Sequence, residues 1–233
     1  MNADEQAWWG ETHKALNAII LKPREHARSV DLFLDLHAAV HASSISGLKE
    51  PTLDDDVFHE LKESVFRTYP VQLPNTKNSV AWHLWHITRI EDMTMSILVA
   101  DTSQELHSGD WIERLNTWFT HSGNEMSTDE VAELSGTLHL AALKSYREAV
   151  GRRTRELVSG LEPGAFKEKV NPQRIARLFA EHAVTPEAAW LAEYWGKKNI
   201  GGLILMPATR HIFMHLKKCM HIKEKFAKTS TQL

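Results

Sequence analysis

One stretch of the chain, residues 79–92, decides the fold and reads SVAWHLWHITRIED. Apolar residues recur in it three and four positions apart, as they do along one face of a helix. The residues of that face are Val80, Leu84, Ile87 and Ile90. The stretch therefore predicts a long, largely buried helix over residues 78–101, capped by Asn78 or Ser79. This helix carries two histidines, His83 and His86.

A second histidine pair lies about 125 residues further on, in RHIFMHL at residues 210–216. His211 and His215 are four positions apart, so they share one helix face and can bind a single ion. A histidine of the first stretch, either His83 or His86, completes a three-ligand site if the two helices pack together. Imidazole suits Zn, Ni, Cu and Fe, and three protein ligands leave positions open for water or substrate. The two pairs therefore predict a catalytic rather than a structural metal.

Helical spacing of apolar residues continues through most of the remaining chain. It predicts one or two helices over residues 4–46, with a break near Pro23, and further helices over residues 51–69, 137–160 and 203–226. Residues 173–194 are also expected to be helical, with an interruption near Thr185-Pro186. Thr52 and Ser127 are expected helix caps. Pro207 is tolerated in a first turn, so the last helix is expected to begin near it, and the tail after Ala227 is expected to fray. Convincing alternating strand patterns are absent, and the chain reads as all-α, most simply a four-helix bundle with long connections.

Composition limits the class of protein. The chain has 233 residues, enough for one large domain, and 42% of them are apolar, which is enough for a core. A net charge of −3 gives no strong basic field for nucleic acid. Cys219 is the single cysteine, which rules out an internal disulfide and suggests a reducing compartment. No apolar run is long enough for a membrane span, and the polar start differs from a signal peptide. We therefore expect a soluble cytoplasmic protein.

Other residues offer competing interpretations. His37 and His41 form a third pair four positions apart, which makes them a rival metal site or part of a pocket. Cys219 follows His215 by four positions, and packing as a small apolar residue suits it better than ligation. Motifs of other enzyme classes are missing: the chain has no HExxH, no Glu-x-x-His, no P-loop, no GxGxxG and no GxSxG.

In their order and spacing, residues 79–92 and 207–216 resemble the matching segments of the DinB/YfiT-like superfamily of metalloenzymes. The resemblance implies a DinB-like four-helix bundle with a core over about 30–226 and an N-terminal helical extension. It also implies that residues 1–233 form a single domain.

In that family, one ligand of the second bundle helix is followed by an aliphatic step and, about five positions on, by an acidic residue. His86, with Ile87 and Glu91 after it, fits this pattern better than His83. Carried over residue by residue, the resemblance implies three metal ligands: His86, His211 and His215.

The resemblance also implies an activity. Members of the family include thiol-dependent S-transferases that use thiols such as mycothiol or bacillithiol, in stress or detoxification chemistry. The expected cofactors are a divalent ion (Zn, Ni, Mn or Fe) and a low-molecular-weight thiol. The expected substrate is a small molecule, and the expected assembly is a homodimer. A close variant is a hydrolase with metal-activated water.

Residues for the substrate pocket are less sharply indicated. The candidates are Arg210, Arg89, Trp82, Trp85, His83 and His41, together with Phe213 and Met214. An arginine would bind a carboxylate of thiol or substrate through its fork of donors. The alternative function is a non-catalytic helical module for ligand binding or dimerisation, with an empty or structural histidine site.

Overall fold

The computed structural model describes residues 1–230, and residues 231–233 lie outside the described part. Within this range the chain forms helices and no β-strand, which confirms the predicted all-α fold. The α-helices are α1 Ala3–Ile19, α2 His26–Ala38, α3 Ser43–Ser46, α4 Leu53–Phe58, α5 Glu63–Arg67, α6 Val80–Asp92, α7 Trp111–Leu115, α8 Thr128–Thr137, α9 Leu140–Ser159, α10 Pro172–Ala180, α11 Ala189–Gly196, α12 Ile200–Leu205 and α13 His211–Ser230. Short 3₁₀ turns and two π-helical segments, Met93–Val99 and Met206–Arg210, complete the elements.

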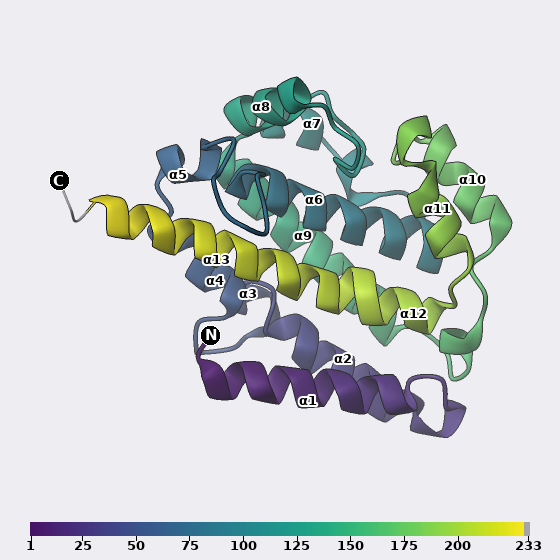
Figure 1. The fold of residues 1–233 in the computed structure, drawn as a ribbon. Coiled ribbons are helices and arrows are strands. Elements are labelled where there is room, and N and C mark those ends of the chain that lie inside the picture. The colour runs from purple at the N-terminus through teal and green to yellow at the C-terminus, as the bar shows by residue number, and fades with distance from the viewer. Residues whose placement is uncertain (231–233) are drawn as a thin grey trace.

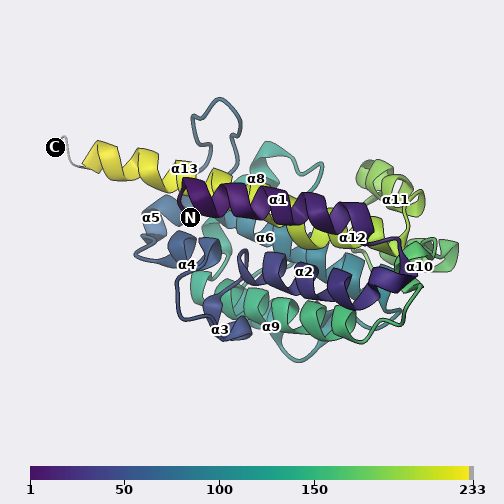
Figure 2. The same ribbon diagram turned by 90° about the horizontal axis from the view of Figure 1, so that it is seen from below.

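Four long helical runs form the bundle. α6 lies centrally and packs against both α9 and α13, and α2 packs against α9 (Figure 1). α12 and α13 form one continuous helical run through Met206–Arg210. α1 lies outside the bundle along α2, in the position of the predicted N-terminal extension (Figure 2). The bundle therefore brings residues 80–92 and 211–230 into direct contact.

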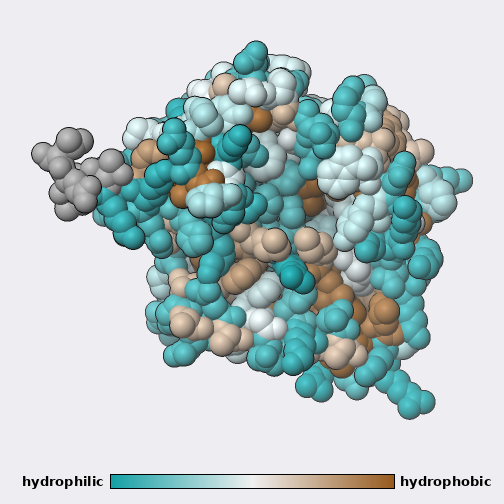
Figure 3. Space-filling view, in the orientation of Figure 1, coloured by the Kyte–Doolittle hydropathy of each residue, from teal (hydrophilic) through white to brown (hydrophobic). Residues whose placement is uncertain are grey.

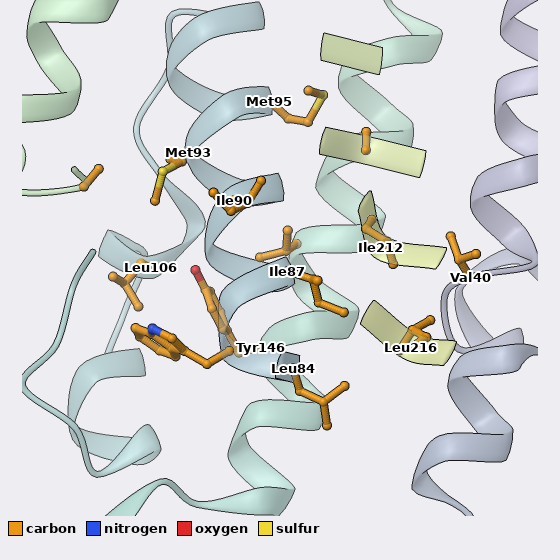
Figure 4. Close-up of a cluster of buried hydrophobic side chains, with 14 of the residues drawn as sticks. Val40, Leu84, Ile87, Ile90, Met93, Met95, Leu106, Tyr146, Ile212 and Leu216 are labelled. Atoms are coloured by element: carbon orange, nitrogen blue, oxygen red, sulfur yellow. The ribbon is translucent and has the colours of Figure 1, made fainter. Parts of the chain in front are cut away.

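The core lies where these helices meet. In Figure 4, Leu84, Ile87 and Ile90 of α6 point toward the side chains of Ile212 and Leu216 of α13 and toward Val40. Every one of these side chains is buried. Burial of one such side chain contributes about 1.5–3 kcal/mol to folding. The outer face in Figure 3 is mostly hydrophilic, with smaller hydrophobic patches between.

Three predicted helix caps are confirmed. The side chain of Ser79 accepts a hydrogen bond from the backbone N–H of Trp82, at the start of α6. Thr52 and Ser127 each form a reciprocal capping box, with Asp55 and with Glu130. These short polar residues satisfy backbone donors that have no partner inside the helix.

Three local expectations differ from the structure. His41 lies in the turn after α2, which ends at Ala38, so His37 and His41 do not share one helix. The last helix does not start near Pro207, because it begins at Ile200 with Asn199 as its cap and passes through the proline as a π-helix. α13 extends to Ser230, beyond the expected fraying point, and residues 231–233 lie outside the described range.

A candidate metal centre beside an aromatic pocket

Three histidines from two helices meet at the contact of α6 with α13. One ring nitrogen from each of His86, His211 and His215 lies within 4.8 Å of the other two. Nε2 of His86 and Nε2 of His211 are 3.1 Å apart. Two nitrogens bound to one ion at about 2.0–2.1 Å lie roughly 3 Å apart when they are neighbours in its coordination shell. The spacing and the donor type therefore fit a divalent transition metal.

The ring of His86 is held in a fixed orientation. Its Nδ1 lies 2.7 Å from the backbone oxygen of Ser122, so it must donate a proton to that carbonyl. Its Nε2 then carries a lone pair directed at the centre. The ring also stacks on Trp82, with centroids 4.5 Å apart and planes inclined by 12°. A hydrogen bond from the ring nitrogen that does not face the ion, such as the bond to Ser122, fixes the tautomer of a metal-binding histidine.

His83 supports the centre indirectly. Its Nδ1 lies 2.9 Å from Nδ1 of His215, and its Nε2 lies 2.9 Å from Oγ1 of Thr76. One consistent proton arrangement has His215 donating to His83 and His83 donating to the Thr76 hydroxyl. Nε2 of His215 is then left for an ion. The geometry thus places His86 with the α13 pair and His83 behind it, and the ligand roles themselves stay a prediction.

A distortion of the last helix positions His211. Pro207 has no N–H and its ring would clash with the preceding turn, so a regular α-helix cannot continue there. The helix widens into a π-helix over Met206–Arg210, a form that often marks such sites. Oγ1 of Thr209 donates to the backbone oxygens of Ile204 and Leu205. These bonds tie the π-helical segment to the turn before it, and α13 begins immediately after with His211.

Burial keeps the imidazoles of the centre neutral. It lowers the pKa of His86 to about 4, against the opposing effect of the bond to Ser122. Burial, followed by the proximity of His86, lowers the pKa of His211 and of His215 well below the ordinary value. Neutral imidazole is the form that binds metal, so no proton has to be removed near pH 7.

One face of α6 holds the loop that anchors His86. The side-chain nitrogens of Trp82, Trp85 and Arg89 donate to the backbone oxygens of Gly123, His121 and Thr120, at 3.2, 3.2 and 3.0 Å. With His86, these residues occupy positions i, i+3, i+4 and i+7 of one helix face. The loop over residues 120–123 is therefore fixed by α6 side chains along its whole length.

A pocket of about 250 Å³ adjoins the centre. His86 and His211 form part of its wall, and α11 supplies most of the opposite side. The other lining residues are Ile90, Asn124, Trp190, Leu191, Tyr194, Trp195, Met206 and Pro207. Trp190 and Tyr194 are 49% and 40% exposed, so the aromatic wall reaches the surface. The pocket is thus mostly apolar, with the asparagine amide as its neutral polar group.

The residues predicted for the pocket lie elsewhere among the described part of the chain. Trp82, Trp85 and Arg89 are buried and hold the loop, and Arg89 also bonds Asp92 at 2.8 Å. His83 lies behind His215, and Met214 is largely exposed on α13. Phe213 stacks on Trp9 of α1.

Two further predicted residues have distinct surroundings. Arg210 is exposed beside His211. His41 is buried in a separate cluster with His37 and Glu91.

The fold and centre define a helical bundle with a three-histidine cluster between its second and last long helices. A family model, the DinB superfamily, matches residues 48–217, and the chain belongs to this superfamily. The matched range contains all three clustered histidines and begins after His37 and His41. A search of curated proteins gave no match. No helix within residues 1–230 is long and apolar enough to cross a membrane.

Sequence reasoning missed the aromatic wall. Trp190, Tyr194 and Trp195 recur with helical spacing, but that pattern is equally typical of a packed helix face. They lie more than 95 residues from His86 in sequence, so only the tertiary contact of α11 with the bundle brings them to the site. The one signal in the sequence was the gathering of three aromatic residues within positions 190–195.

Proposed function

We propose that this protein is a metal-dependent enzyme, a thiol-dependent S-transferase whose ion is held by His86, His211 and His215. One observation carries the proposal: two of the three clustered histidines also line an apolar, aromatic pocket that opens to the surface. Membership of the DinB superfamily supports it. A purely structural ion would instead be enclosed by protein ligands.

The chemistry divides between the ion and the chain. A divalent ion at three imidazoles would lower the pKa of a cofactor thiol and supply thiolate at neutral pH. His86 and His211, which line the pocket, would hold the ion that supplies this nucleophile. Trp190, Tyr194 and Leu191 offer an apolar surface for the electrophile and exclude water from one side of it.

The proposed transfer is a displacement at carbon. The sulfur forms a new S–C bond, and the leaving group departs with the electron pair of the bond that breaks. The thiol proton passes to solvent, since the described residues that line the pocket include no carboxylate to accept it. The leaving group exits the same way, past Trp190 and Tyr194.

Arg210 is a second element of the proposal. It is exposed, and it immediately precedes His211 at the junction of the π-helix with α13. It lies outside the lining of the pocket and close enough to His13 of α1 to lower the pKa of that histidine, so its guanidinium would bind a carboxylate of a thiol cofactor that extends beyond the pocket. Arg210→Gln should then raise the KM for a carboxylate-bearing thiol several-fold and leave the metal content unchanged.

The experiment compares thiols and variants on metal-loaded protein. Zn²⁺-loaded enzyme is mixed with 1-chloro-2,4-dinitrobenzene and, in turn, mycothiol, bacillithiol, glutathione or cysteine, and thioether formation is followed by absorbance. We expect at least one thiol to react well above the uncatalysed rate, with the activity lost in His211→Ala. Trp190→Ala should raise the KM for the electrophile, whereas Trp8→Ala, at an exposed tryptophan of α1 outside the pocket, should not.

Two results would count against the transferase. Activity toward an ester that needs metal but no thiol would indicate a hydrolase. A protein that binds its ion yet accelerates neither reaction would favour the non-catalytic module.

A further inference from the structure

A second polar cluster lies inside the bundle, on another face of α6. Nε2 of His37 is 2.8 Å from Oε1 of Glu91, and Nε2 of His41 is 3.0 Å from Oε2 of the same carboxylate. The two imidazole rings stack with centroids 4.1 Å apart. All three side chains are fully buried. The cluster joins the end of α2 and the turn after it to α6.

Its hydrogen bonds are incomplete. His41 Nε2 and Glu91 Oε2 are close but not aligned as a hydrogen bond, and both lack a partner among the described residues. Nδ1 of His37 and Nδ1 of His41 are also buried without a partner. Unpaired buried polar atoms are costly, so a group of four in one place indicates a missing ligand.

The charge of the cluster is not balanced by its neighbours. The buried guanidinium whose charge acts on both imidazoles is that of Arg147, which is paired with Asp54 at 2.5 Å. A buried carboxylate without a cation is strongly unfavourable.

We propose that His37, His41 and Glu91 form a second metal site, which holds a divalent transition ion as a structural link between α2 and α6. Two imidazoles and one carboxylate are a common donor set for zinc and iron. One ligand atom from each residue lies within 4.8 Å of the others. The nitrogen-to-oxygen distances of 2.8 and 3.0 Å match those between neighbouring ligands of one ion.

Two observations separate this site from the first. All three side chains are fully buried, so the ion would be enclosed and would stabilise the fold instead of meeting a substrate. His37 and His41 also precede residues 48–217, the range that the DinB superfamily model matches. The inference therefore does not depend on the proposed enzyme function.

The test counts ions and measures stability in the full chain. Protein is stripped with chelator, loaded slowly with Co²⁺ or Zn²⁺, dialysed and analysed for bound metal. We expect two equivalents in the wild type, one in the double variant His211→Ala/His215→Ala, one in Glu91→Gln and none in the combined variant. In the double variant, Zn²⁺ should raise the midpoint of thermal unfolding by about 5 °C or more when it is well above its dissociation constant.

The outcomes are distinguishable. The wild type could bind only one equivalent of metal. If Glu91→Gln keeps that ion and His211→Ala/His215→Ala loses it, the second site is overturned and the first stays intact. The opposite pattern would overturn the enzyme proposal and keep this one. If Glu91→Gln fails to fold, the double variant decides: no bound ion and no thermal shift would mean that the cluster holds only protons or water.

Discussion

At the scale of the residue, His83 and His86 differ in role although both are buried on α6. Nε2 of His86 faces His211, whereas the contacts of His83 are Nδ1 of His215 and the hydroxyl of Thr76. We expect His86→Leu to abolish binding of the first ion. His83→Leu should keep the stoichiometry and weaken affinity about 10- to 100-fold, the usual effect of removing a supporting contact. Competition titration against a chromophoric chelator measures both.

The matched variant for this prediction is Thr76→Val, which removes the hydroxyl that His83 contacts through Nε2. It should also weaken the affinity for the ion, by a smaller factor than His83→Leu. If His83→Leu removed the ion entirely while His86→Leu retained it, the assignment would be reversed: His83 would be the metal ligand and His86 the supporting residue.

The residues differ in how far sequence alone could assign them. His211 and His215 are four apart on one helix, so their proximity follows from helix geometry. Their meeting with His86 needs two helices in the correct register, which the family resemblance implied and spacing alone did not. Glu91 pairs with His37 and His41 through a contact spanning about 50 residues. Sequence alone offered His37 and His41 as a rival metal pair, but no local periodicity contains their contact with Glu91, so the third member of the cluster could not be predicted.

At the scale of the element, Gly151 sets how closely α9 approaches the turn after α2. A Cβ at this position would lie 2.6 Å from Nδ1 of His41 and 2.8 Å from Cδ1 of Ile45. Because both neighbours are packed side chains, Gly151→Ala should destabilise the protein by about 1–3 kcal/mol. It should also weaken binding of the proposed second ion, since the His41 side chain must move. Chemical denaturation with and without Zn²⁺ measures both effects.

The same substitution on α1 is the control. Gly10 also lies within a helix, but a Cβ there would meet nothing within 4 Å. Gly10→Ala should therefore stabilise the protein by about 0.5–1 kcal/mol, because alanine loses less conformational freedom on folding. Equal effects of the two substitutions would show that helix propensity, and not the approach of α9, governs Gly151.

Elements were predicted best where local chemistry determines them. Ser79, Thr52 and Ser127 mark helix starts because their side chains bond backbone donors within three residues. Pro207 was misjudged for a tertiary reason: the π-helix lets the chain pass the proline, and His13 of α1 contacts the backbone oxygen of Leu205 at 2.9 Å. A contact with another helix, such as the one from His13, cannot be predicted from the periodicity of the sequence.

At the scale of the whole molecule, buried neutral histidines make stability depend on pH. Burial lowers the pKa of His41 and His83 to about 3 and that of His86 to about 4. In the unfolded chain the same groups titrate near 6.5. Between these values the unfolded state binds protons that the folded state excludes, so stability falls as pH decreases below 6.5. Above pH 6.5 both states are neutral at these groups and the effect vanishes.

The magnitude makes acid unfolding of the metal-free protein the expected result. At pH 5 each such group costs the folded state about 2 kcal/mol, and domains are typically stable by only about 5–15 kcal/mol. We therefore expect the free energy of unfolding, from urea titrations in chelator, to drop steeply between pH 6.5 and 5. His83→Leu should reduce the number of protons taken up on unfolding by about one, so the free energy of unfolding falls less steeply with decreasing pH. His59→Gln, at an exposed histidine, should leave the slope unchanged. A stability that stays level from pH 7 to 5 would contradict the assignment of these buried imidazoles as neutral in the metal-free fold.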